Sequence, residues 1–133
     1  MTQTTYLMDT HALIFWSTQE SVSDEFLLFF DRQEQHGNLF VSPISFWETA
    51  FLVKRGRIEL DNIYAWKDEL LSNSGIQLLS PTAAEMIDSV NLPTIHKDPF
   101  DRLLVAQARQ NNCRLVTVDT HIKQYEVETF WLK

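Results

Sequence analysis

Cysteine and glycine are scarce, and this limits the chemistry open to the chain. Its 133 residues include one cysteine and three glycines. The single cysteine, Cys113, excludes an internal disulfide and cannot by itself build a thiolate zinc site. Three glycines hardly suffice for a phosphate-cradling loop, and neither the P-loop pattern nor the Gly-rich dinucleotide fingerprint occurs. The sequence therefore argues against nucleotide binding through such loops.

Long hydrophobic runs are also missing. No apolar stretch approaches the roughly 20 residues that span a bilayer, and the first residues lack the basic and apolar regions of a signal peptide. We therefore expect a cytoplasmic protein without a membrane partner. Because 44% of the residues are hydrophobic, the chain can bury a real core, and we expect one domain over residues 1–133.

Basic residues are fewer than acidic ones. Eleven lysines and arginines face 18 aspartates and glutamates, and the net charge of −7 argues against a general basic surface for nucleic acid. A nuclease is still compatible with this charge, because acids that hold metal ions would bias the total in the same direction. Short basic groups remain at residues 54–57, at Lys97 with Arg102, and at Arg109 with Arg114. Each group alone is most simply a solvated helix end.

Strand and helix patterns alternate along the chain. Short apolar stretches predict strands at residues 5–8, 39–41, 76–79 and 114–118, with an edge strand at 127–131. Apolar spacing and capping residues predict helices at residues 11–16, 21–35, 44–55, 61–72, 82–90 and from 98 to beyond 108. This alternation predicts an α/β fold of three layers, in which helices flank a mostly parallel sheet of four or five strands.

The last long predicted helix begins with two carboxylates three residues apart, Asp98 and Asp101. Asp98 is followed by Pro99, and this pair is typical of a helix start. The aspartate can accept an unpaired N–H as the N-cap, and proline suits the first helical position. Asp101 then falls in the first helical turn, at the edge of the predicted core.

Three further acids are expected near Asp101. Asp9 and Asp119 directly follow predicted strands, and Glu48 lies on the apolar face of the helix after the second strand. Because ligands bind beyond the carboxyl ends of parallel strands, these four acids can gather at one edge of the sheet. Taken singly, each acid has a structural explanation as a helix cap, a first-turn acid or the partner of a nearby basic residue.

Four carboxylates at one edge repel one another unless a cation neutralises them. Hard oxygen ligands with few nitrogens suit Mg²⁺ or Mn²⁺. Such an ion orients and polarises a phosphodiester and lowers the pKa of a water molecule that attacks it. The four acids together therefore indicate metal-dependent phosphodiester chemistry.

Four sequence blocks, in this order and spacing, resemble the signature of PIN domains, and most of all the VapC toxins of type II toxin–antitoxin systems. The blocks are Tyr-Leu-Met-Asp-Thr-His at residues 6–11, Ser-Pro-Ile-Ser-Phe-Trp-Glu at 42–48, His-Lys-Asp-Pro-Phe-Asp-Arg-Leu-Leu at 96–104 and Leu-Val-Thr-Val-Asp at 115–119. The resemblance implies a Mg²⁺- or Mn²⁺-dependent endoribonuclease. Its catalytic and metal-binding residues would be Asp9, Glu48, Asp101 and Asp119.

The same resemblance implies roles for residues around the four acids. Asp98 would be accessory, either as a helix cap or as a group that contacts the metal ligands without binding the metal itself. Thr117 would help to orient Asp119 or a water molecule. Lys97 and Arg102 are candidate contacts for RNA. Three histidines flank the acids, and orienting hydrogen bonds are a simpler role for them than metal ligation. These histidines are His11, His96 and His121.

The resemblance also implies partners. They are an RNA substrate, an antitoxin whose tail occupies the acidic groove, and a second copy of the chain in a homodimer. Residues 26–30 are five apolar residues in a row, which either belong to the core or cover a partner.

Two other functions remain open at this point. The first is a phosphotransfer domain, such as a haloacid-dehalogenase-like phosphatase or a receiver domain, with Asp9 as the nucleophile. His11 weakens this hypothesis because it stands where the phosphatase pattern needs a second acid. The second is a non-catalytic interaction module, in which the acids are only helix caps and the apolar helix binds a partner.

Overall fold

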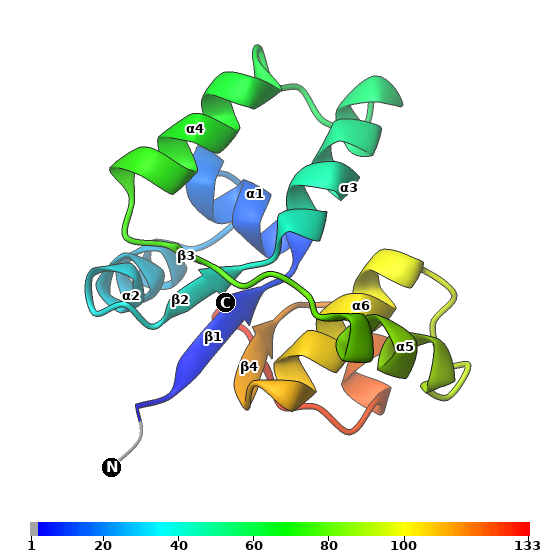
Figure 1. Ribbon diagram of the computed structural model, residues 1–133. Coiled ribbons are helices and arrows are strands. Elements are labelled where there is room, and N and C mark those ends of the chain that lie inside the picture. Colours follow the sequence, from blue (N-terminus) through cyan, green and yellow to red (C-terminus); the bar gives the residue numbers. More distant parts are fainter. Residues whose placement is uncertain (1–2) are drawn as a thin grey trace.

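Five short parallel strands form the centre of the fold (Figure 1). The computed structural model describes residues 3–133. The strands lie in the order β3-β2-β1-β4-β5, so the first strand of the chain is the middle one of the sheet. The strands are β1 (Thr5–Met8), β2 (Leu39–Val41), β3 (Gln77–Leu78), β4 (Cys113–Val116) and β5 (Thr129–Phe130). The prediction of a mostly parallel sheet of four or five strands is thus confirmed.

Helices cover both faces of this sheet. Along β1, Tyr6 and Met8 pack into one hydrophobic cluster and Leu7 packs into the other, as the alternation of side chains in a strand requires. The first cluster joins the sheet to α1, α2 and α4, and the second joins it to α6, to Ile44 at the start of α3 and to Leu92 just after α5. The helices are α1 (Thr10–Thr18), α2 (Asp24–Gln35), α3 (Pro43–Lys54), α4 (Ile63–Asn73), α5 (Ala83–Asn91) and α6 (Pro99–Gln110).

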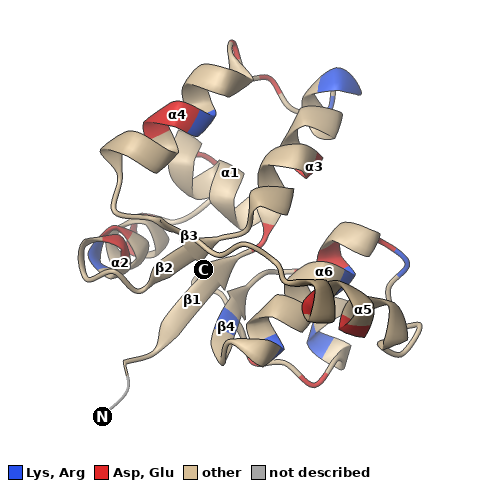
Figure 2. Cartoon of the chain, viewed as in Figure 1, with Lys and Arg blue, Asp and Glu red and all other residues tan. Residues whose placement is uncertain are grey.

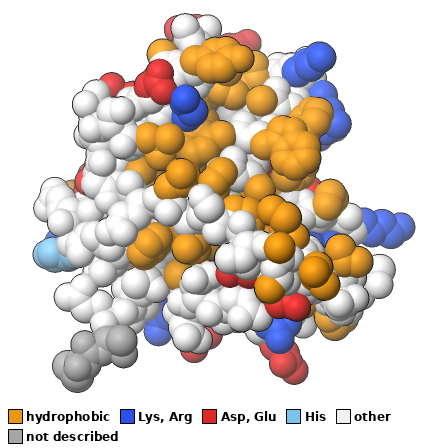
Figure 3. Space-filling view, viewed as in Figure 1, with side chains coloured by type: hydrophobic (Ala, Val, Ile, Leu, Met, Phe, Trp, Pro, Cys, Tyr) orange, Lys and Arg blue, Asp and Glu red, His pale blue; other side chains and the backbone are white. Residues whose placement is uncertain are grey.

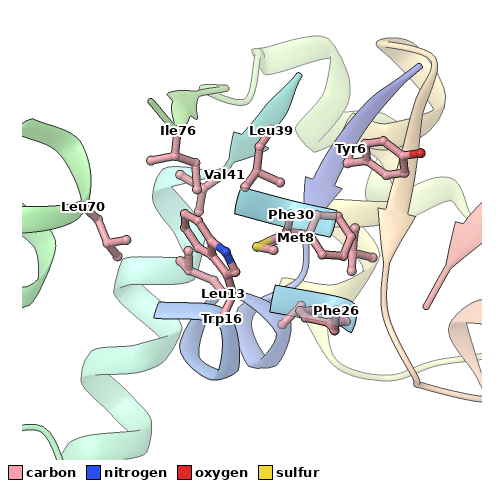
Figure 4. Close-up of a cluster of buried hydrophobic side chains, with 12 residues drawn as sticks. Tyr6, Met8, Leu13, Trp16, Phe26, Phe30, Leu39, Val41, Leu70 and Ile76 are labelled. Carbon is pink, nitrogen blue, oxygen red and sulfur yellow. The ribbon is translucent and has the colours of Figure 1, made fainter. Parts of the chain in front are cut away.

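The apolar run of residues 26–30 belongs to the core. Phe26 and Phe30 are fully buried in the first cluster, which Figure 4 shows beneath β1 and β2. The ring of Tyr6 meets that of Phe30 edge to face, with centroids 5.6 Å apart. Leu28 alone in the run is largely exposed, at 63%. The run therefore needs no partner to cover it.

Caps at the helix starts fix where the strands end. Asp9 follows β1 and accepts the N–H of Ala12 at 2.8 Å, which starts α1. Asp98 accepts the N–H of Phe100 at 2.9 Å and starts α6, as the Asp-Pro pair predicts. Because β1, β2 and β4 are parallel neighbours, the residues that follow them meet at one edge of the sheet.

The last two strands are shorter than predicted. β4 stops at Val116, so Thr117 and Val118 lie beyond the strand, and the edge strand β5 is reduced to Thr129–Phe130. A 3-10 turn, η1 (Ile122–Gln124), separates the two strands. Among residues 3–133, no helix has both the length and the apolar character needed for a membrane crossing.

Candidate metal centre

The four predicted acids come from four different elements and meet at one end of the sheet. Asp9 follows β1, Glu48 lies on α3, Asp101 lies in the first turn of α6, and Asp119 follows β4. Figure 2 shows acidic segments at the end of β1, on α3 and at the start of α6. After burial, the charges of Asp98, Glu48, Asp9 and Asp119 raise the pKa of Asp101, so each of these acids lies near Asp101.

Asp9 is the most enclosed acid, with 7% of its surface exposed. Burial raises its pKa from 3.8 to about 6, although hydrogen bonds from Thr117 and from the N–H of Ala12 oppose the shift. Thr117 is itself fully buried, and its hydroxyl oxygen accepts the N–H of Asp119 at 3.0 Å. Thr117 thus connects two of the acids, and its orienting role stays a prediction.

Glu48 is buried on the inner face of α3 and is incompletely satisfied. Burial raises its pKa, and a hydrogen bond from Thr10 opposes the shift. Its Oε1 atom is buried and has no hydrogen-bond partner among residues 3–133. A buried carboxylate oxygen without a partner is costly, since it has lost its water. This atom is therefore suited to receive a cation.

Asp101 and Asp119 share one histidine. The Nε2 atom of His96 lies 3.0 Å from Oδ2 of Asp101 and 3.3 Å from Oδ2 of Asp119. Burial, followed by the repulsion of the surrounding carboxylates, raises the pKa of Asp101 to about 8. For Asp119, hydrogen bonds from the N–H groups of Ile122 and His121 and from His96 outweigh burial and lower the pKa.

The hydrogen bonds of His96 define its role. Its Nδ1 atom accepts the N–H of Asp98 at 3.1 Å, so the proton of the neutral ring is assigned to Nε2. Nε2 then donates to Oδ2 of Asp119, lies 3.0 Å from Oδ2 of Asp101, and has no lone pair to offer a metal. This geometry agrees with the orienting role predicted for the flanking histidines. His121 and His11 are exposed, with Nδ1 of His121 3.6 Å from Asp119.

Arg102 has a structural role in place of the predicted contact with RNA. Its guanidinium donates to five backbone carbonyls, at 2.8 to 3.2 Å, and to the hydroxyl of Tyr125 at 3.3 Å. These bonds engage all three nitrogens, so no N–H is left for a phosphate. The carbonyls belong to Ser89, Val90, Leu92, Pro93 and His96. Arg102 therefore holds the segment that leads from α5 to His96.

Tyr125 supports the same segment and was not identified in the sequence. Its hydroxyl accepts the N–H of His96 at 2.8 Å and donates to the carbonyl of Pro93 at 2.9 Å. The side chain is 29 residues from His96 along the chain, so no local pattern links the two. Lys97 is exposed and, within the part of the chain that the structure describes, forms no ion pair with an acid.

The donor set fits a hard divalent cation. It offers carboxylate oxygens, one of them unpartnered, in a place where burial and mutual repulsion disfavour their charges. A divalent cation would remove that repulsion, and oxygen ligands are those that Mg²⁺ and Mn²⁺ prefer. One side-chain oxygen or nitrogen atom each of His96, Asp101 and Asp119 lies within 4.8 Å of the other two.

Comparison with known proteins identifies the family. The sequence profile of the PIN domain matches residues 6–128. This chain belongs to the PIN domain family. As a PIN domain, it is 30% identical to ribonuclease VapC22 of Mycobacterium tuberculosis over 125 residues, which is 92% of each chain. The match contains all four acids of the candidate metal centre.

Solved structures share the fold of this PIN domain. A chain of the VapBC2 complex from Rickettsia felis, bound to a promoter DNA fragment, superposes with a TM-score of 0.71 and 17% identity. That match covers 93% of this chain and 95% of the other. A chain of the DNA-bound VapBC complex from Salmonella typhimurium gives a TM-score of 0.69, 14% identity and 96% coverage of both chains. At these identities the likeness concerns the fold alone.

Proposed function

We propose that this protein is a metal-dependent endoribonuclease and the toxin of a type II toxin–antitoxin module. The observation that carries the proposal is the cluster of four carboxylates, in which Asp9, Glu48 and Asp101 all have raised pKa values and Oε1 of Glu48 lacks a partner. Membership of the PIN family and the likeness to a VapC ribonuclease support it.

The four acids would hold Mg²⁺ or Mn²⁺ between them. When bound, the cation would polarise the phosphodiester and promote attack by water. The chain prepares the site in two ways. Thr117 and His96 fix the orientation of the acids, and the raised pKa values mean that Asp101 in particular carries a proton at neutral pH until a cation displaces it. Asp98 caps α6 and so sets the position of Asp101.

A cleavage assay tests this function. Purified protein is incubated with RNA and Mn²⁺ or Mg²⁺, and we expect cleavage that EDTA abolishes. Asp101→Asn should be inactive, because one metal ligand loses its charge. Asp98→Asn is the matched control, since asparagine is an equally good N-cap and should retain much of the activity. Cleavage that survives EDTA or Asp101→Asn would contradict the proposal, and the reverse ranking of the two variants would show that the wrong aspartate was chosen.

The structure does not favour the alternative with Asp9 as a nucleophile. Oδ1 of Asp9 is already engaged as the cap of α1, and the side chain is almost fully buried. Trapping of an aspartyl-phosphate would be needed to revive that hypothesis. The purely structural hypothesis explains Asp9, Asp98 and Asp119, which accept backbone N–H groups, but it leaves the unpartnered Glu48 unexplained.

The toxin role and several exposed apolar side chains both point to protein partners. Met86, Ile87 and Val90 project from one side of α5 and are 47 to 75% exposed, and Trp47 on α3 is 60% exposed. Figure 3 shows hydrophobic side chains gathered over one face of the molecule. We propose that an antitoxin and a second copy of this chain cover such surfaces. The exchange Ile87→Asp should then weaken the homodimer, which light scattering would measure, and a homodimer unaffected by it would exclude this side of α5.

We also propose that residues 1–133 work as one domain. A single sheet joins the first strand to the last, since β1 pairs with β4 and β4 with β5. A cooperative unfolding transition, seen identically by two spectroscopic probes, is expected. The toxin role has a separate genomic test, which is a short reading frame just upstream that encodes a DNA-binding segment and a tail.

A further inference from the structure

A groove of about 970 Å³ lies directly beside the acid cluster. Its walls come from α1, α3, the segment after α3 and the start of α6. Glu48 and Asp98 are part of the wall, so the groove opens onto the candidate metal centre. Whatever occupies it lies next to the bond that the acids would cleave.

Basic side chains line this groove although the chain as a whole is acidic. Arg55, Arg57 and Lys97 are three of its eleven lysines and arginines, and all three are exposed. Within residues 3–133, none of them has a carboxylate within ion-pair distance. Figure 2 shows the basic segments at the end of α3 and in the loop before α6. Their charges are therefore available to an anionic ligand.

Aromatic rings form much of the remaining surface. Phe51 and Phe100 both line the groove, with ring centroids 6.1 Å apart. The guanidinium carbon of Arg55 lies 5.1 Å from the centre of the Phe51 ring, so the arginine is held over an aromatic face. Phe15 adds a third ring. Rings and guanidinium planes are the surfaces on which unpaired bases stack.

We infer that this groove binds a single-stranded stretch of RNA next to the scissile phosphate, with its phosphates on Arg55, Arg57 and Lys97 and a base against Phe51 or Phe100. The inference rests on the proposed nuclease function and names where its substrate lies. Charge complementarity favours RNA, since three unpaired cations surround an aromatic floor. A duplex is a poor ligand because its base faces are hidden in the stack. An acidic protein segment is the competing occupant.

The test is RNA binding by the full chain in EDTA, where no cleavage interferes. A fluorescent, short single-stranded RNA of mixed sequence is titrated at several salt concentrations, and its anisotropy is measured. The double variant Arg55→Gln/Arg57→Gln should bind about tenfold more weakly or worse. It should also lower the slope of log affinity against log salt by about 0.7 for each lost phosphate contact.

The matched control is Arg32→Gln/Arg109→Gln, which removes the same charge from exposed arginines outside the groove. It should bind within about twofold of the wild type. Phe51→Leu removes a stacking ring without changing charge, so we expect roughly fivefold weaker binding with an unchanged salt slope. A duplex of the same sequence should bind more weakly than the single strand.

Equal RNA affinity of the groove variant and the wild type would overturn the inference and leave the groove to a protein segment. An equal loss in the control variant would also overturn it, because binding would then depend on overall charge alone. Parallel cleavage assays in Mn²⁺ separate the two hypotheses. If the wild type cleaves RNA and Arg55→Gln/Arg57→Gln cleaves and binds it equally well, only the RNA-binding role of the groove is contradicted. If RNA binding depends on the groove but the wild type does not cleave RNA, only the proposed nuclease function is contradicted.

Discussion

The exchange Asp101→Asn should make the metal-free protein more stable while it destroys the activity. Burial and the neighbouring carboxylates raise the pKa of Asp101 from 3.8 to about 8. The folded protein therefore keeps a proton that the unfolded chain has released, and its stability falls as pH rises from about 4 through about 8. Asparagine cannot ionise, so the variant escapes this loss. In EDTA its advantage should be absent near pH 4, should grow as the pH rises, and should be largest near pH 8.

The size of the effect follows from the shift. One pKa unit corresponds to about 1.4 kcal/mol, so a shift of roughly four units sets an upper limit of about 5 to 6 kcal/mol. The acids titrate together and share protons, and we therefore expect a gain of about 1–3 kcal/mol. For a chain of this size each kcal/mol raises the melting temperature by roughly 3–5 °C.

Thermal unfolding in EDTA across this pH range measures the gain. Asp98→Asn preserves the cap but removes the largest of the charges that repel Asp101, so it should show a smaller gain with the same dependence on pH. Addition of Mn²⁺ should stabilise the wild type near pH 8 and stabilise Asp101→Asn much less. An Asp101→Asn variant no more stable than the wild type near pH 8, or a wild type whose stability does not fall between about pH 5 and 8, would refute the reasoning.

Three further predictions concern the surroundings of the acids. Calorimetry should show that His96→Ala weakens Mn²⁺ binding about tenfold and that His96→Gln, which keeps an N–H donor, recovers part of this loss. If His96→Ala and His96→Gln bind Mn²⁺ with equal affinity, the orienting role of His96 is contradicted. Arg102→Met should cost about 2 kcal/mol or more in urea unfolding, because five carbonyls lose a charged donor; a loss below about 0.5 kcal/mol would contradict that anchor. Asp98→Ala should be about 1 kcal/mol less stable than Asp98→Asn by the same measurement, since both variants remove the charge and only alanine removes the cap; equal stability of the two variants would contradict the capping role.

The layers of the fold and the edge that carries the acids could be predicted from the sequence because their signals are local. Short apolar stretches and cap residues such as Asp9 and Asp98 fix where strands stop and helices begin. The parallel arrangement of neighbouring strands then brings the following residues to one edge. Glu48 was predicted because an acid on an apolar helix face is unusual in itself.

The roles of Arg102, Tyr125 and residues 26–30 depend on tertiary contacts. The carbonyls that accept from Arg102 belong to the last turn of α5 and the loop after it, six to thirteen residues away, and nothing in a local pattern marks them. Tyr125 meets His96 only through the fold. Residues 26–30 are apolar all round the helix, and only the neighbouring β1 and β5 show that both sides of Phe30 are covered.

The central claim is that the four acids hold a divalent cation, and calorimetric titration of the wild type with Mn²⁺ near pH 7 tests it most directly. Repeating the titration in buffers of different ionisation enthalpy counts the protons released. We predict binding with release of about one proton, because Asp101 with a pKa of about 8 must give up its proton to bind the ion. We also predict that Asp101→Asn abolishes both the binding and the proton release. No binding by the wild type, or equal binding by Asp101→Asn, would contradict the account.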